Sequence, residues 1–345
     1  MTEEPQIPRL PATMHDLFSS GVLRSDAGKR VLIARDDNVL PFPKSRTLLA
    51  LMWATTYYEK TMPPTPPAAA RPMGQSDKMP IPGVKTLVAV ASGKGGVGKT
   101  TVAVNLAIAL SRMGAAVGLM DADVYGPNVP LMLGTEEQPR AISERQIMPV
   151  EAYGLKMISM GLLTPADKPM IWRGPMLHSV VQQFLRSVQW GELDHLIVDL
   201  PPGTGDVQLS LIQNVPLTGA VVVTTPSAVA LADVRKAIEM FRQVNVEVLG
   251  IVENMSYLAC PHCQKRVDVF GHGEGRRIAE AYGVPLLGEI EIDPGIRVGG
   301  DTGKPVASLG ADAPQARSLY AMARSVAARV AEASATGTGP RVEIM

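Results

Sequence analysis

The sequence predicts a doubly wound α/β domain built on a mainly parallel β-sheet. Two observations lead to this fold class. Short, continuously apolar segments bounded by glycine, proline or aspartate alternate with longer amphipathic segments, which is the pattern of a parallel sheet covered by helices on both faces. A glycine-rich string, GKGGVGKTT at 93–101, stands between the first apolar segment and the first amphipathic one. Repetition of this strand–helix order indicates a doubly wound arrangement.

The predicted strands are six apolar runs, at 86–92, 116–122, 195–200, 220–225, 248–253 and 285–290. Such runs suit strands buried on both faces. Predicted helices lie at 100–113, 174–188, 228–243 and 274–282, and an alanine-rich helix at 314–334 carries Leu319, Met322 and Val326 on one stripe. Gly114 is expected to end the first of these helices.

A proline cluster divides the chain into parts. Seven prolines lie from Pro63 to Pro82, and because proline fixes its own backbone and removes a donor, 63–83 is predicted to be an extended linker. Residues 84–335 then form the α/β domain, and 336–345 form a tail. Residues 1–62 contain an apolar stretch at 48–58 that suits a short helix, but they show no recognisable module or site.

Composition excludes several classes of protein. The 345 residues are 46% hydrophobic with a formal net charge of zero, which excludes a wholly disordered chain and gives no support for nucleic-acid or anionic-membrane binding. The aromatic content of 4% argues against a base-stacking platform. The N-terminus lacks the pattern of a secretory signal, and no apolar run is long enough to span a bilayer. A cytoplasmic location is therefore expected.

The string at 93–101 contains the pattern GxxxxGK[ST] between a predicted strand and a predicted helix. Glycines let backbone N–H groups converge on phosphate oxygens, and the helix N-terminus adds positive potential. We expect Lys99 to reach the β- and γ-phosphates and the Thr100 hydroxyl to ligate Mg²⁺. The predicted nucleotide contacts are Gly93, Lys94, Gly95, Gly96, Val97, Gly98, Lys99, Thr100 and Thr101.

A second lysine, Lys94, gives the string KGGVGKT. This string resembles the deviant Walker A loop of the ParA, MinD and nitrogenase-iron-protein class of P-loop NTPases. The resemblance implies that Lys94 contacts the nucleotide across a dimer interface and neutralises the charge that develops in phosphoryl transfer. The alternative for Lys94 is an ordinary solvated loop lysine.

Carboxylates follow two predicted strands, as metal organisation and water positioning require. Asp121 and Asp123 end one strand, where strand alternation predicts that their side chains point the same way, and Asp199 ends another. Resemblance to the class implies that Asp123 orients the attacking water, that Asp121 lies near the Mg²⁺ shell and that Asp199 holds Mg²⁺ through water. Each aspartate could instead cap a turn or helix.

The identity of the base rests on weaker signals. Asn254 ends a predicted strand, and resemblance to the class implies that it pairs with adenine. A later loop around Asp293 and Pro294 resembles the segment beside the base. Because no GTPase-type NKxD string occurs, ATP is the expected nucleotide.

The only cysteines of the chain, Cys260 and Cys263, form a CPHC string. Three kinds of site fit CxxC: a thioredoxin-type redox pair, a structural zinc site with His272 as a third ligand, or a site shared between two copies. His262 is badly placed to join a zinc site from between the cysteines. In the shared site, two chains supply four thiolates, which suits a [4Fe–4S] cluster.

Several strings together resemble the Mrp/ApbC family of iron–sulfur cluster carrier ATPases across about residues 84–330. They are SGKGGVGKTTVAVNLA, DADVYGPNVP, DLPPGTGD, ENMSYLACPHC, FGHGEG and DTGKPV. The resemblance implies a homodimer that assembles a labile [4Fe–4S] cluster at Cys260 and Cys263 and passes it to apo iron–sulfur proteins. ATP, Mg²⁺ and the cluster are the implied ligands, and Lys94, Lys99 and Asp123 are the implied catalytic residues.

Two other functions stay open at this point. A positioning ATPase similar to MinD or ParA needs a membrane-targeting helix or a basic DNA-binding surface, and the C-terminal string TGTGPRVEIM suits neither. An ATPase stabilised by zinc, without cluster transfer, is the other alternative.

Overall fold

The computed structural model describes residues 22–24, 30–32, 79–123, 126–143, 146–162, 174–205, 208–209, 212–213 and 215–335. The chain divides into two compact units, Met1–Arg46 and Thr47–Met345. In the first unit, β1 (Val22–Arg24) and β2 (Arg30–Leu32) form an antiparallel pair. The helix predicted at 48–58, most of the linker and the tail lie outside the described residues.

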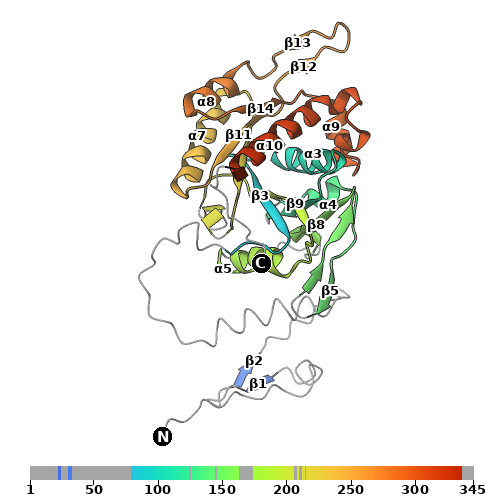
Figure 1. The fold of residues 1–345 in the computed structure, drawn as a ribbon, viewed down its shortest axis with the longest axis vertical. Helices are drawn as coiled ribbons and strands as arrows, with labels where there is room; N and C mark the ends of the chain where they lie inside the picture. Colours follow the sequence, from blue (N-terminus) through green and yellow to red (C-terminus); the bar gives the residue numbers. More distant parts are fainter. Residues whose placement is uncertain are drawn as a thin grey trace. The chain divides into compact units, whose positions relative to one another are not determined.

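The second unit is organised around an eight-stranded sheet with the order β14-β11-β10-β3-β9-β4-β8-β7 (Figure 1). The strands are β3 (Val84–Ala91), β4 (Val117–Asp121), β7 (Val150–Ala152), β8 (Leu155–Ser159), β9 (Leu193–Asp199), β10 (Gly219–Thr224), β11 (Val248–Glu253) and β14 (Leu286–Glu289). Neighbouring strands run parallel, except that β7 is antiparallel to β8 at one edge.

Helices cover both faces of this sheet. On one face lie α3 (Lys99–Arg112) and α10 (Arg317–Ala335), which contact each other. On the other lie α5 (Gly174–Ser187), α7 (Ala228–Gln243) and α8 (Glu274–Tyr282). In β3, Leu87 and Ala89 face one layer while Val88 and Val90 face the other, as strand alternation requires. The predicted doubly wound α/β fold is confirmed.

Shorter elements surround the layers. They are α4 (Val129–Met132), α9 (Pro294–Asp301), the 3₁₀ turns η2 (Met160–Leu162), η3 (Val306–Leu309) and η4 (Pro314–Ala316), and two hairpins, β5 (Arg140–Ser143) with β6 (Gln146–Met148) and β12 (Leu258–Ala259) with β13 (Arg266–Val267). No helix among the described residues combines the length and apolar character needed to cross a bilayer.

All six predicted strands are present, with ends that differ by no more than two residues. The segment at 140–159 contains strands that the sequence analysis does not predict: it contributes β5 to β8, and β8 continues the parallel sheet beside β4. These strands are short and carry charged residues such as Glu151 and Lys156, so they lack the apolar run that marks a central strand. The helix predicted at 314–334 begins only at Arg317, after the turn η4.

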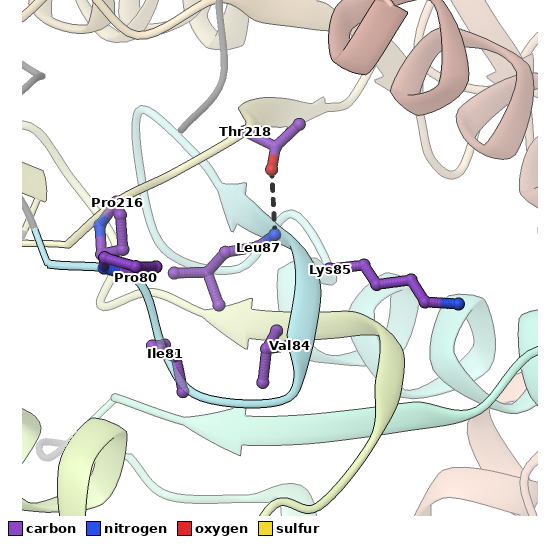
Figure 2. Close-up of a pocket in the computed structure, with 7 residues that line it drawn as sticks. All are labelled: Pro80, Ile81, Val84, Lys85, Leu87, Pro216 and Thr218. Atoms are coloured by element: carbon purple, nitrogen blue, oxygen red, sulfur yellow. Dashed lines mark hydrogen bonds between the residues drawn. The ribbon is translucent and has the colours of Figure 1, made fainter. Parts of the chain in front are cut away.

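The chain reaches the sheet at the end of β3 that is remote from the phosphate loop. A small pocket there is lined by Pro80, Ile81, Val84, Lys85, Leu87, Pro216 and Thr218 (Figure 2). The Arg186 guanidinium donates hydrogen bonds of 2.6 Å to the carbonyls of Met79 and Pro80. These contacts anchor the last linker residues to α5.

Candidate functional site

The predicted phosphate loop lies between the carboxyl end of β3 and the N-terminus of α3. Gly98 is the N-cap residue of α3 and has a φ of 79°, a left-handed conformation that favours glycine. A Cβ atom at Gly98 would collide with the Asn254 amide nitrogen, and one at Gly93 with the backbone of Asp233. The loop therefore needs glycine both for its conformation and for its close packing.

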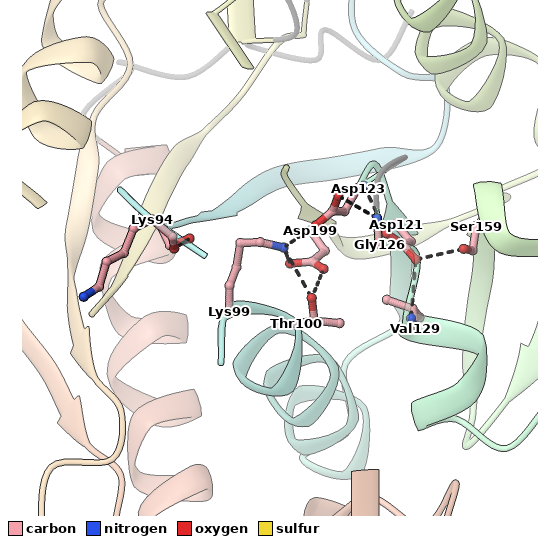
Figure 3. A network of polar contacts seen from close by, with 10 residues as sticks. Lys94, Lys99, Thr100, Asp121, Asp123, Gly126, Val129, Ser159 and Asp199 are labelled. Atoms are coloured by element: carbon pink, nitrogen blue, oxygen red, sulfur yellow. Dashed lines mark hydrogen bonds and ion pairs between the residues drawn. The ribbon is translucent and has the colours of Figure 1, made fainter. Parts of the chain in front are cut away.

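The first two residues of α3 meet the end of β9. Lys99 Nζ lies 2.6 Å from Asp199 Oδ1, and Thr100 Oγ1 donates a 2.7 Å hydrogen bond to Asp199 Oδ2 (Figure 3). The Lys99 and Asp199 side chains are buried. A hydroxyl and a carboxylate oxygen at this separation are the hard ligands that Mg²⁺ prefers, so this pair fits the predicted metal site.

Asp123 approaches the same lysine from the loop that follows β4. Its Oδ2 lies 3.8 Å from Lys99 Nζ, and its Oδ1 accepts a 3.3 Å hydrogen bond from the Gly126 N–H. The structure therefore brings Lys99, Asp123 and Asp199 together, as the sequence predicts. Because β4 ends at Asp121, Asp123 lies beyond the strand, and the expectation that both aspartates end it holds for Asp121 only.

Asp121 is held from the side of β8 and α4. Its Oδ2 accepts hydrogen bonds from Ser159 Oγ at 2.8 Å and from the Val129 N–H at 3.4 Å, while Oδ1 accepts from the Asp123 N–H at 3.1 Å. Complete burial, together with the charge of Asp199, raises the pKa of Asp121 to about 8, although the Ser159 hydrogen bond and the Lys99 charge oppose the shift. These contacts connect the carboxylate to the loop that carries Asp123.

Lys94 points away from this cluster (Figure 3). The Lys94 carbonyl accepts a 2.9 Å hydrogen bond from Ser92 Oγ, and the Ser92 carbonyl accepts one of 3.0 Å from the Gly203 N–H. The glycine-rich segment after β9 is thus bonded directly to the start of the phosphate loop. The last residue of the DLPPGTGD string, Asp206, lies outside the described residues.

The two segments predicted to lie beside the base are hydrogen-bonded to each other. The Ile290 N–H donates to the Glu253 carbonyl, and the Ser256 N–H donates to the Ile290 carbonyl. Asn254 is buried against the phosphate loop, where its Nδ2 donates a 2.9 Å hydrogen bond to the Val97 carbonyl. Asp293 is the N-cap residue of α9, with Pro294 at the first position, and its side chain accepts from the Gly295 N–H.

The two cysteines lie in the turn of the β12–β13 hairpin. The Cys260 N–H donates to the Lys265 carbonyl, and the Gln264 N–H donates to the Cys260 carbonyl, which closes the turn around them. Cys263 is exposed and Cys260 is half-buried. Backbone N–H groups of Cys263 and His262 hold the pKa of the Cys260 thiol below its ordinary value, which favours the thiolate that binds metals.

The third ligand considered for a zinc site does not join the cysteines. His272 Nδ1 instead lies 3.0 Å from Arg266 Nη2 and 3.6 Å from Asp268 Oδ1. Within the part of the chain that the structure describes, no group of three or more histidine, cysteine, aspartate or glutamate side chains is placed to hold a metal ion.

Three residues of this region were missed by sequence reasoning: Ser159, Glu253 and Arg266. Ser159 ends β8, a strand that was not predicted, although the alternation in LKMIS after a Tyr-Gly turn could have indicated it. Glu253 is a charged residue that ends an apolar strand and is 1% exposed, so it needs a buried partner. No pattern in the sequence distinguishes Arg266.

Comparison with known proteins gives the family. The model described as ParA, NUBPL iron-transfer P-loop NTPase, matches residues 83–327. A relative from Deinococcus radiodurans named "Iron-sulfur cluster carrier protein" is 55% identical over 251 residues, 72% of this chain and 71% of the relative. The Dictyostelium discoideum "Iron-sulfur cluster transfer protein NUBPL" is 47% identical over 254 residues, 73% of this chain and 79% of the relative.

Solved structures agree with this match. A nucleotide-binding protein from Archaeoglobus fulgidus in complex with ADP superposes with a TM-score of 0.59 and 39% identity, covering 66% of this chain and 89% of that one. The cell division ATPase MinD of Pyrococcus furiosus shares the fold, with a TM-score of 0.54, 23% identity and coverage of 70% and 98%. The phosphate loop, the aspartates and the cysteine hairpin lie within the matched residues, and this chain belongs to the ParA/NUBPL family of iron-transfer P-loop NTPases.

Proposed function

We propose that the chain is an ATP-dependent iron–sulfur cluster carrier whose cargo is one [4Fe–4S] cluster shared by two copies. The observation that carries the proposal is the position of Cys260 and Cys263 in an exposed hairpin turn without a third ligand from the described part of the chain. A [4Fe–4S] cluster takes four thiolates, one for each iron, so one chain supplies half of them and a twofold axis through the turn supplies the other half. The names of the relatives support an iron–sulfur cluster as the cargo, without specifying its type.

The nucleotide half of the proposal uses the cluster around Lys99. In it, Lys99 leaves Asp199 to contact the β- and γ-phosphates, because the phosphates supply more negative charge than one carboxylate. Thr100 and Asp199 would hold Mg²⁺, with Asp121 behind them, and the ion supplies neutralisation of phosphate charge. The ADP complex of the Archaeoglobus relative supports nucleotide binding on this fold.

Hydrolysis then depends on Asp123 and Lys94. Asp123 Oδ2 lies 3.8 Å from Lys99 Nζ, so it borders the position that the phosphates would take, and we assign it the orientation of the attacking water. Lys94 points away from Lys99 and the aspartates of its own chain (Figure 3), which suits a lysine that serves the nucleotide site of the opposite copy. In that position it would neutralise charge on the γ-phosphate as the bond to it breaks.

The cargo half of the proposal requires that the cluster can leave. Thiolates in a turn outside the sheet are reachable by the cysteines of an apo iron–sulfur protein, so ligands can be exchanged one at a time. A site buried in the core would not permit this exchange. We therefore assign apo iron–sulfur proteins as the recipients.

The experiment is anaerobic reconstitution followed by analysis of iron, sulfide, zinc and oligomer size. We expect four iron and four sulfide per two chains in a dimer, and loss of both in the double variant Cys260→Ser/Cys263→Ser with ATP binding retained. His262→Ala, in the same turn, is the matched control and should keep the cluster. Zinc in place of iron, or a monomer without iron and sulfide, would refute the proposal.

A further inference from the structure

Arg266 makes an unusual number of contacts for a residue of a two-residue strand. Its Nη1 donates a 2.8 Å hydrogen bond to Glu289 Oε2, and its Nε donates one of 2.6 Å to Asp268 Oδ1. Its guanidinium carbon lies 4.4 Å from the centre of the Tyr257 ring. A planar guanidinium can serve these partners at once, whereas an ammonium cannot. Arg266 thus fixes β13 to the end of β14 and to the segment before β12.

A second set of bonds continues from Arg266 into the core. Its Nη2 lies 3.3 Å from Ser256 Oγ, which donates a 2.7 Å hydrogen bond to Glu253 Oε1. The other oxygen of Glu253 accepts a 2.8 Å hydrogen bond from the Gly275 N–H at the start of α8. Because Glu253 is buried, its carboxylate depends on these donors. The position of the cysteine hairpin is therefore tied to the end of β11.

The residue after Glu253 contacts the phosphate loop. Asn254 Nδ2 donates to the Val97 carbonyl, and the amide nitrogen packs where Gly98 has no side chain. A phosphate bound by the loop acts on the N–H groups around Val97 and Gly98. Any resulting shift of the loop reaches Asn254 through this hydrogen bond, and Glu253 and Ser256 through the backbone.

From these contacts we propose that Arg266 is a positioning residue that couples the phosphate loop to the cysteine hairpin. Nucleotide binding shifts the segment 253–256, and Arg266 transmits the shift to the turn that holds Cys260 and Cys263. The biological role of this coupling rests on the proposed function, in which the nucleotide would control access to the two thiolates that bind the iron–sulfur cluster. It does not require that a cluster be present.

Coupling of this kind is an energetic relation between two sites and is reciprocal. If a nucleotide changes the exposure of the thiols, then a change in the conformation of the hairpin must in turn change the affinity for the nucleotide. Contact along a chain of residues is not by itself a demonstration of coupling, so the test must measure how one site responds to the other, with and without Arg266.

The test is the rate of alkylation of Cys260 and Cys263 by iodoacetamide in the reduced full-length apoprotein. It is measured with and without a non-hydrolysable ATP analogue and Mg²⁺. For the wild type, we expect the nucleotide to change the rate by about 5-fold or more. In Arg266→Gln this ratio should fall to one, and the affinity for the analogue, measured separately by titration, should change by no more than the factor lost from the ratio, as reciprocity requires. Arg277→Gln is the matched control, because Arg277 makes an exposed pair with Glu274 on α8, and it should keep the wild-type ratio.

A conservative variant separates positioning from simple stabilisation of the hairpin. Arg266→Lys keeps the charge near Glu289 but cannot reach Ser256 and Asp268 together. Compared with Arg266→Gln, it should therefore recover more of the wild-type thermal midpoint than of the effect of the nucleotide on the alkylation rate.

If Arg266→Gln does not fold, Ser256→Ala removes the contact toward Glu253 and should also reduce the effect of the nucleotide on the alkylation rate. The coupling would be overturned if the analogue leaves the alkylation rate of the wild type unchanged, or if the Arg266 and Ser256 variants show the same change in rate as the wild type. Either result would leave the [4Fe–4S] site to be judged by iron and sulfide analysis.

Discussion

Lys99 Nζ lies 2.6 Å from Asp199 Oδ1, although 100 residues separate the two along the chain. Both side chains are buried, and Thr100 bonds the second oxygen of the same carboxylate. Removing one partner of a buried ion pair leaves a charge without compensation, whereas replacing both with apolar residues of similar size often does not destabilise. The pair therefore links the stability of the domain to the residues that should bind phosphate.

This relationship predicts the outcome of a double-mutant cycle. Lys99→Met should lower the free energy of unfolding by about 3–5 kcal/mol, and the double variant Lys99→Met/Asp199→Leu should recover most of that loss. Neither variant should hydrolyse ATP. The measurement is urea unfolding of the wild type, Lys99→Met, Asp199→Leu and the double variant, and additive losses in the double variant would contradict the pairing.

A complementation experiment tests whether Lys94 acts on the site of the opposite copy. Lys94→Gln and Asp199→Asn should each be inactive as ATPases. A mixed dimer contains one site with both residues if Lys94 acts across the interface. An equal mixture should then recover about a quarter of the wild-type rate, because half of the dimers are mixed and each has one complete site. A mixture that stays inactive would show that Lys94 serves its own chain, or that no dimer forms.

The rate of the Lys94 variant alone gives the size of the effect. Loss of a residue that neutralises transition-state charge lowers kcat by about 10³-fold or more, and nucleotide affinity should change far less. Single-turnover hydrolysis separates the two quantities. Lys304→Gln, at an exposed position, is the control and should behave as the wild type.

The burial of His195 leads us to predict that the stability of the fold depends on pH, independently of the nucleotide and cysteine sites. Burial holds the pKa of His195 below its ordinary value of 6.5, against the charge of Asp194, and its Nδ1 lies 2.7 Å from Thr86 Oγ1. Between the lower folded pKa and 6.5, the unfolded chain binds more protons, so stability must rise with pH.

We therefore compare the wild type with His195→Gln by urea unfolding from pH 5 to pH 7.5. The advantage of the wild type should grow as the pH rises toward 7, by at most about 1.4 kcal/mol per pH unit. It should be lost as the pH falls below 6.5. A difference that is flat or that shrinks with rising pH would show that His195 is not held neutral by the fold.

Asp293 has two expected roles that substitutions can separate. Its side chain caps α9 by accepting from the Gly295 N–H, so Asp293→Ala should cost about 1 kcal/mol, whereas Asp293→Ser should keep most of the cap. If Asp293 also contacts the base, both variants should weaken the preference for ATP over GTP. Competition binding with the two nucleotides decides this, and an unchanged preference in both variants would leave Asp293 with the cap alone.

Features that depend on local order can be predicted from the sequence. The phosphate loop is one continuous string, and its conformation follows from glycines at 96 and 98 that adopt positive φ. The buried strands are continuous apolar runs, and the helices between them show their period in the sequence. The CxxC spacing likewise places two thiols in one turn, whatever surrounds it.

Which distant residues meet follows from the packing of the folded chain and could not be predicted from the sequence. Strand β8 joins the sheet because β4 offers an unpaired edge, and this brings Ser159 to Asp121. Arg266 contacts Glu289, Ser256 and Tyr257 because the fold places its hairpin beside the ends of β11 and β14. A buried carboxylate or an arginine accepts many possible partners, so its choice depends on which backbones the packing of the core brings within hydrogen-bond distance.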